Sequence, residues 1–322
     1  MALVRANRNS ASSVNQTMHR GRLLRHTVLT ILIFFPFTYM LFLFKRTSSS
    51  INTSTSSDAL RKSNAHQLSN VQATDQKKVV RKTNAFRCKS KKSIVDGMLM
   101  SQSKEDEELL YVYGFDQICG GTYLEMGGLD GRMYSNSYVF HKALDWKGVL
   151  VEASPTNYAK MIKKRPNEIA NVNAGICGKE KDLHWVEGGN PVGSGNAVSG
   201  FLEFAPETFQ QSWWNEEKIK NAKVIKCRTL KNVLKETVGD HFHFDFFALD
   251  IEGAEYDALV SIDFSLVSFG VIFVEADGHN PLKNMAVRTL LTSVGYTFIK
   301  DHNRSYWFVN NDFGRIYEDL IH

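Results

Sequence analysis

The chain has 322 residues, of which 43% are hydrophobic and 11% aromatic, so it can bury the core of one or two ordinary domains. Its net charge of +5 conceals an asymmetry: residues 1–100 carry 17 Lys and Arg against 3 Asp and Glu, whereas the remainder carries 22 against 31. The basic excess lies outside the acidic part that should fold, which argues against a nucleic-acid partner. The four cysteines form no closely spaced pair, which argues against a zinc site.

Residues 27–44 (TVLTILIFFPFTYMLFLF) form an 18-residue stretch without a charge. A helix of this length rises about 27 Å, close to the roughly 30 Å of a bilayer core, so the stretch predicts one transmembrane signal-anchor helix after a basic tail (1–26). The alternative is a cleaved signal peptide. It is disfavoured because the basic segment is long, the apolar run exceeds the usual length of roughly 7–15 residues, and no small-residue cleavage site follows it.

The segment after the anchor indicates the side of the membrane on which the domain lies. Residues 45–94 are polar, with a Ser/Thr-rich start typical of a glycosylated stalk and a basic run without acids between Lys77 and Lys92. Acceptor sequons at Asn52 and Asn303 and the positive-inside rule favour a cytosolic N-terminus. We therefore expect a single-pass type II protein of the Golgi or endoplasmic reticulum membrane. Some cysteines should then be oxidised, and the sequence leaves the pairing open among Cys88, Cys119, Cys177 and Cys227.

Residues 95–322 alternate between strand-like and helix-like segments. The expected strands, in chain order, are 121–128, 147–155, 168–178, 181–188, 223–230, 243–250 and 270–276, followed by a hairpin within 296–310. The expected helices are 101–115, 135–146, 156–165, 229–239, 253–262 and 284–296. This alternation predicts an α/β fold with a mostly parallel sheet, helices on both faces, and ligands at the carboxyl ends of the strands.

The first candidate site follows strand 121–128, in the sequence EMGGLDG (125–131). It is not the G-x-G-x-x-G motif, and Glu125 and Asp130 would repel a pyrophosphate, so a dinucleotide cofactor is disfavoured. The sulfonium and ammonium groups of S-adenosylmethionine suit these acids, and Gly127 allows the backbone to approach a ligand closely. The alternative is a simple strand–helix turn in which Asp130 caps the helix.

Polar residues also follow three later strands. They are Glu152, then Asp250, Glu252 and Glu255, and then Glu275, Asp277 and His279. Glu152 lies one βα unit after the first motif, where a carboxylate can accept both hydroxyls of a ribose. The alternative reading is a set of solvated acids or acids that complement a helix dipole, and we favour the latter for Glu255.

Several segments, taken in order, resemble the FkbM family of S-adenosylmethionine-dependent methyltransferases. They are SQSKEDE (101–107), GTYLEMGGLDGRMYSNS (121–137), WKGVLVEASP (146–155), NAGICG (173–178), Ser199-Gly200, CRTL (227–230), FALDIEGAEYDAL (247–259), VIFVEA (271–276) and Gly295-Tyr296. The resemblance implies a class I, Rossmann-like methyltransferase fold with a seven-stranded, mostly parallel sheet. It also implies methyl transfer, mostly to oxygen in sugars or natural products.

The resemblance implies roles for individual residues. The expected cofactor-binding residues are Glu125, Gly127, Asp130, Ser135, Asn136, Glu152 and Ala174. The first three should line the methionine part of S-adenosylmethionine, Glu152 should hold the ribose, and Ala174 should lie beside the adenine. Ser199 and Gly200 should belong to a loop on the substrate side.

Catalysis is expected to depend on Asp250 as a general base, with its pKa raised by partial burial. His279 is the alternative base, because an imidazole titrates near neutrality. The methyl group on a sulfonium is already electrophilic, so no metal is required. The alternative is a Mg²⁺ ion held by four hard oxygen ligands, namely Asp250, Glu252, Glu275 and Asp277.

Three functions are consistent with these sequence features. The preferred one is an O-methyltransferase that acts on a hydroxyl of a glycan or glycoconjugate in the secretory pathway. The second is a membrane-tethered O-methyltransferase for small molecules or lipids that faces the cytosol. The third is a non-catalytic binding module that retains the fold. The partners expected in the first two cases are a hydroxyl-bearing substrate and, through one helix, the membrane.

Overall fold

The computed structural model describes residues 84–89, 92–188, 198–276, 278, 280–302 and 304–321. The expected membrane anchor (27–44), the basic tail and most of the stalk lie outside these residues, as do Asp277, His279 and Asn303. Within the ranges described, no helix is long and apolar enough to cross a membrane.

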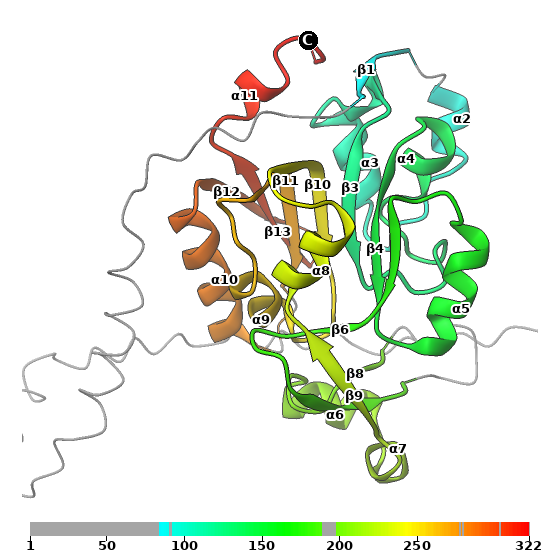
Figure 1. Cartoon of the computed structure of the whole chain (residues 1–322), viewed down its shortest axis with the longest axis vertical. Coiled ribbons are helices and arrows are strands. Elements are labelled where there is room, and N and C mark those ends of the chain that lie inside the picture. The colour runs from blue at the N-terminus through cyan, green and yellow to red at the C-terminus, as the bar shows by residue number, and fades with distance from the viewer. Residues whose placement is uncertain are drawn as a thin grey trace, which may run out of the picture. The chain divides into compact units, whose positions relative to one another are not determined.

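The main sheet has seven strands in the order β12-β13-β11-β10-β3-β4-β5 (Figure 1). Their bounds are β3 (Thr122–Met126), β4 (Lys147–Glu152), β5 (Ala170–Asn173), β10 (Phe242–Leu249), β11 (Val267–Glu275), β12 (Tyr296–His302) and β13 (Ser305–Asn310). The pairings from β5 to β11 are parallel, whereas β13 pairs antiparallel with both β11 and β12. The sheet is thus mixed but mostly parallel. It has the expected number of strands and the expected final hairpin, but the expected strands 181–188 and 223–230 do not belong to it.

Successive side chains of a strand point to opposite faces, and the two faces of this sheet bury different cores. Leu124 and Val149 pack in one cluster with residues of helices α8 (Leu230–Thr237), α9 (Glu255–Val260) and α10 (Pro281–Ser293). Tyr123 and Leu150 pack in the other cluster with residues of α3 (Glu105–Tyr111), α4 (Tyr138–Ala143) and α5 (Pro155–Lys164). Because both faces are covered, the central strand β10 is buried from its second residue to its last.

The helices begin where the sequence supplies a cap. The Ser154 hydroxyl accepts from the backbone N–H of Asn157 at the start of α5, and Thr229 caps α8 in the same way. The Asn280 side chain caps α10, and Pro281 occupies its first turn, where no backbone N–H donor is needed. These caps fix the helix starts that follow the carboxyl ends of β4 and β11.

A second, four-stranded sheet lies below the main sheet in Figure 1, with the order β6-β9-β7-β8. Its bounds are β6 (Gly175–Ile176), β7 (Asp182–Val186), β8 (Gly200–Phe201) and β9 (Lys223–Arg228), and the helices α6 (Glu207–Trp213) and α7 (Glu216–Lys220) lie between β8 and β9. The expectation of one strand over 168–178 was wrong, because β5 ends at Asn173 and β6 pairs with β9 instead. A Cβ at Gly175 would lie 2.1 Å from the Phe201 ring, so only glycine permits this packing.

Short elements complete the structure. They are β1 (Phe86–Arg87), α2 (Lys92–Asp96), the 3₁₀ helix η1 (Phe115–Gln117), β2 (Ile118–Cys119) and α11 (Phe313–Ile316). The strands β1 and β2 pair antiparallel. This pairing extends the folded part of the chain to the N-terminal side of residue 95.

All four cysteines form disulfide bonds. Cys88 pairs with Cys119, which joins the β1 region to β2. Cys177 pairs with Cys227, which joins the end of β6 to β9. The sequence left these pairings open, because the Cα–Cα separations of 5.7 and 5.9 Å arise only when the chain folds.

Candidate active site

A cavity of about 400 Å³ lies at the carboxyl ends of the main strands. One wall is formed by residues that end or follow β3, β4, β5 and β10, which are Met126, Gly127, Val151, Glu152, Ala174 and Asp250. The facing wall is aromatic and comes from the second sheet and α6: Trp185, Phe201, Phe209 and Trp213. A cavity of this size, with apolar walls and a few polar groups, is typical of a small-molecule site.

The structure brings five of the predicted site residues to this cavity and leaves three elsewhere. Gly127, Asn136, Glu152, Ala174 and Asp250 line it, and so does Ser199 of the expected substrate-side loop. Glu125, Asp130 and Ser135 are not among the lining residues. His279, the alternative base, lies outside the described residues.

Glu125 is 2% exposed and serves the loop that forms the cavity wall. Its carboxylate accepts hydrogen bonds from the Ser135 hydroxyl (3.0 Å), from the Asn136 backbone N–H (2.7 Å) and from the Ser137 hydroxyl. Burial raises the pKa of Glu125, while the nearby Arg165 and these donors oppose that shift. Glu125 therefore orders residues 135–137 from behind, and Ser135 takes part as a donor within that network.

Arg165 supplies the positive charge beneath the same loop. Its side chain is fully buried and its Nε donates to Glu168 at 2.7 Å. Its Nη1 donates to the backbone oxygen of Gly131 at 3.0 Å, and its Nη2 donates to the Ser137 hydroxyl at 2.9 Å. A buried cation with several partners of this kind fixes the loop in one conformation.

Asp130 lies on the outer side of the loop. Its Oδ1 accepts from the backbone N–H groups of Arg132 and Met133 at 2.9 and 2.8 Å, and its Oδ2 pairs with Lys164. These backbone hydrogen bonds form a turn within the loop, because α4 begins only at Tyr138 with Ser137 as its N-cap residue. Neither the helix-capping role nor the direct contact with the cofactor that was expected for Asp130 is therefore observed.

Glu152 is 4% exposed and reaches the cavity from the end of β4. Its two oxygens accept from the backbone N–H groups of Leu129 and Ser154, each at 2.8 Å. Burial raises the pKa of Glu152 to about 7, these two donors lower it, and the nearby Glu187 raises it. The carboxyl group is thus held in place and titrates near neutral pH.

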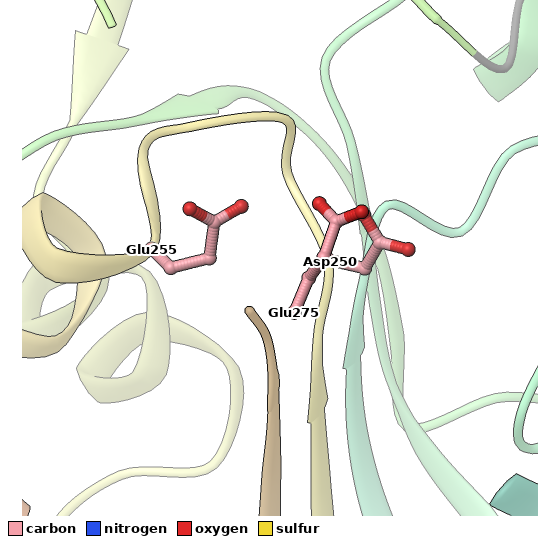
Figure 2. Close-up of side chains that lie close together, drawn as sticks. All are labelled: Asp250, Glu255 and Glu275. Carbon is pink, nitrogen blue, oxygen red and sulfur yellow. The ribbon is translucent and has the colours of Figure 1, made fainter. Parts of the chain in front are cut away.

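Asp250 is exposed, so the expectation of partial burial for this residue was wrong. Figure 2 shows the carboxylate of Asp250 beside that of Glu275, and Glu255 lies on the opposite side of Glu275. Oxygens of these three residues lie within 4.8 Å of one another. Burial and the charge of Asp250, followed by those of Glu252 and Glu255, raise the pKa of Glu275 well above its ordinary value.

Protein cations pair with some of the acids that the alternative hypothesis assigned to a Mg²⁺ ion or that lie beside them. Glu255 accepts from the backbone N–H groups of Ile251 and Gly253, and its second oxygen pairs with Lys283. Glu275 pairs with Arg304. Two of the three clustered carboxylates therefore already hold a protein cation, and Glu255 resembles the helix-supporting acid expected from the sequence.

Strained backbone is concentrated at the cavity. Seven non-glycine residues among those described have a left-handed φ, and four of them line the cavity: Leu129, Tyr134, Glu252 and Arg304. Each such residue costs on the order of 1–3 kcal/mol, and such costs are typical of functional sites. No local pattern indicates these conformations, because none of these residue types is specific to a left-handed backbone.

Sequence reasoning also missed the aromatic wall, since its residues belong to a second sheet and to α6, neither of which was expected. Asn136 was expected in the site, and the structure identifies the relevant atom as its side-chain oxygen. It is buried at the cavity wall and has no hydrogen-bond partner among the described residues. A buried acceptor in this position favours a ligand that carries a hydrogen-bond donor.

Comparison with protein families matches residues 125–298, more than half of the chain, to the methyltransferase FkbM domain. The matched range contains the carboxyl ends of the strands that form the cavity wall, which are β3, β4, β5 and β10. No curated protein matches the chain significantly. The resemblance inferred from the motifs is thereby confirmed.

The Arg165 network generates a prediction about stability. Replacing Arg165 with Met leaves Glu125 and Glu168 buried without their cation, so the free energy of unfolding should fall by about 3–5 kcal/mol. Lys164→Met is the matched control on the same helix, because its ion pair with Asp130 is partly solvated and should contribute less than about 1 kcal/mol. Urea denaturation of both variants measures the difference, and equal losses would contradict a central role for Arg165.

Proposed function

The chain belongs to the FkbM methyltransferase family, and on that premise we propose that it transfers a methyl group from S-adenosylmethionine to a hydroxyl of a glycan or glycoconjugate. The main observation behind this proposal is the cavity at the strand ends, because Glu152 and Asp250 both line it. We further propose the class I, Rossmann-like assignment for the main sheet. Its seven strands, parallel except at β13, and its helices on both faces support that assignment.

The residues of the cavity fit S-adenosylmethionine. The orphan oxygen of Asn136 offers an acceptor for an ammonium group, and the Glu152 carboxyl offers acceptors for ribose hydroxyls. Ala174 and Ile176 offer an apolar surface for a flat base. The negative charge of Asp250 and Glu252 on the remaining wall suits a cationic ligand.

When bound, S-adenosylmethionine supplies an electrophilic methyl group. The chain must hold the acceptor hydroxyl in line and receive its proton as the new C–O bond forms. Asp250 is the proposed proton acceptor, because it follows a buried strand and its exposed carboxylate reaches the cavity. Positioning can supply several kcal/mol, and a placed base adds about 10²–10⁴-fold.

We propose that the domain lies in the lumen of the secretory pathway, which would make the protein type II. The two disulfides support this, because stable disulfides persist in oxidising compartments. The anchor-like segment 27–44 and the two sequons point the same way. A domain that faces the cytosol, with a small-molecule or lipid acceptor, is the alternative that a topology experiment separates.

The titration of Glu152 predicts a pH dependence of cofactor binding. Its folded pKa of about 7 lies above the ordinary value, so the carboxyl becomes protonated as the pH falls through 7. An ionised carboxylate is the better acceptor for two hydroxyls, so affinity for S-adenosylmethionine should fall about five- to tenfold between pH 8 and pH 6. Calorimetry across this range provides the measurement.

Two variants test the assignment of that pH dependence to Glu152. Glu152→Gln should bind weakly and show no midpoint near pH 7. Glu187→Gln should keep the dependence but move its midpoint to lower pH, because Glu187 raises the pKa of Glu152. A wild-type midpoint that neither variant alters would remove Glu152 from the binding site.

Asp250→Asn should lower the rate of methyl transfer about 10²–10⁴-fold, since the amide keeps the shape but cannot accept the proton. The dissociation constant for S-adenosylmethionine should rise much less, by about tenfold at most, since one of the acids on that wall loses its charge. His279→Ala, the variant of the alternative base, should remain active. Transfer of labelled methyl groups to a panel of glycans, with and without EDTA, is the assay. Full activity of Asp250→Asn, or loss of wild-type activity in EDTA that Mg²⁺ restores, would overturn this assignment.

The topology proposal predicts that endoglycosidase treatment shifts the mobility of the full-length protein. Protease added to sealed vesicles should spare the domain, because the membrane protects a luminal segment. The intact mass should rise on reduction by the hydrogens of two disulfides. Digestion of the domain in sealed vesicles, together with an unchanged mass on reduction, would place it in the cytosol instead.

A further inference from the structure

A second, smaller hollow of about 30 Å³ adjoins the main cavity. The residues that line both spaces are Gln102, Tyr134, Asn136, Asp250 and Arg304. The smaller space has room for about one water or one hydroxyl group. Because the proposed base Asp250 lines both spaces, a group held in the smaller one would lie beside Asp250.

Tyr134 is the aromatic residue among those that line both spaces. Its side chain is 38% exposed, and no ring–ring or cation–π contact involves it in the described part of the chain. Its backbone has a φ of +57° and forms a bridge with Ser101. The residues on either side, Met133 and Ser135, are held by Asp130 and Glu125 respectively. The ring thus lines both spaces from a fixed backbone, and within the described part of the chain neither an aromatic ring nor a cation stacks on it.

The polar groups around Tyr134 are mostly hydrogen-bond acceptors. Glu105, Asp250 and Glu275 line the small hollow and contribute carboxylates, whereas Arg304 contributes the positive charge and pairs with Glu275. Carboxyl groups therefore outnumber cations beside the exposed ring, and burial raises the pKa of two of them, Glu105 and Glu275. A neutral ligand with hydroxyl donors suits this setting, whereas an anionic ligand would find only the Arg304 cation, which already pairs with Glu275.

We propose that Tyr134 positions the acceptor, by stacking against the apolar C–H face of a neutral pyranose ring and directing one of its hydroxyls toward Asp250. The negative face of the aromatic ring attracts the C–H groups of a sugar. The rigid backbone of Tyr134 limits the conformational entropy that the protein loses on binding. The carboxylates accept from the remaining hydroxyls. This inference rests on the proposed methyl transfer to a glycan hydroxyl and adds to it the residue that positions the sugar and the preference for a neutral one.

The experiment uses the full chain in detergent with three neutral probes, the methyl glycosides of glucose, galactose and mannose. Methyl glucuronoside is the anionic counterpart of the glucoside. Tyr134→Gly removes the ring and relieves the left-handed backbone, and Tyr134→Phe keeps the ring. Asp145→Gly is the matched control, because Asp145 is exposed, has a φ of +55° and does not line the cavity. Each variant is assayed for S-adenosylmethionine binding by calorimetry and for methyl transfer.

Tyr134→Gly should lower kcat/KM for the neutral glycosides about tenfold, mainly through KM, with cofactor affinity unchanged. Tyr134→Phe should stay within about threefold of wild type, and Asp145→Gly should match wild type. The glucuronoside should be at least about tenfold poorer than the glucoside. Unchanged kinetics in Tyr134→Gly, an equal loss of cofactor affinity, or cofactor binding without transfer to any neutral glycoside would overturn the inference. Wild-type protein that does not bind S-adenosylmethionine would overturn the proposed function itself, and the inference with it.

Discussion

The buried guanidinium of Arg165 is the interaction on which the cavity depends. A cation without solvent exposure is costly unless every donor has a partner, and here the partners are Glu168, Tyr123, two serine hydroxyls and the backbone oxygen of Gly131. Several of these groups belong to the loop between β3 and α4. The charge therefore ties that loop to helix α5, and the loop has little freedom to adopt another conformation.

The rigidity of this loop explains how strained residues persist at the cavity. Leu129 and Tyr134 both have left-handed backbones within it. The carboxylates of Glu125, Asp130 and Glu152 accept hydrogen bonds from the backbone N–H groups of the loop and hold it in place. On the facing side, the Cys177–Cys227 disulfide joins β6 to β9 of the second sheet. The cavity thus lies between two supports that are fixed by different chemistry, one ionic and one covalent.

The carboxylates near the cavity differ in burial, and their surroundings separate their roles. Glu125 is enclosed by donors and orders a loop, whereas Glu152 is buried at the cavity wall and titrates near neutral pH. Glu255 is held by backbone N–H groups and Lys283, and Asp250 alone among these four is exposed. Acids that occupy similar positions at strand ends in the sequence therefore have different roles: some stabilise the structure, and others are candidates for binding or catalysis.

The sequence by itself determined the family, the α/β alternation, most of the individual strands and the strand ends that carry Glu152 and Asp250. These features follow from local patterns: apolar runs of strand length, caps, and acids directly after buried strands. Only the tertiary structure decided the disulfide pairing, the second sheet with its aromatic wall, the withdrawal of Glu125 and Asp130 from the cavity, and the exposure of Tyr134. Each of these depends on contacts between segments far apart in the chain, such as Gly175 against Phe201, which no local spacing encodes.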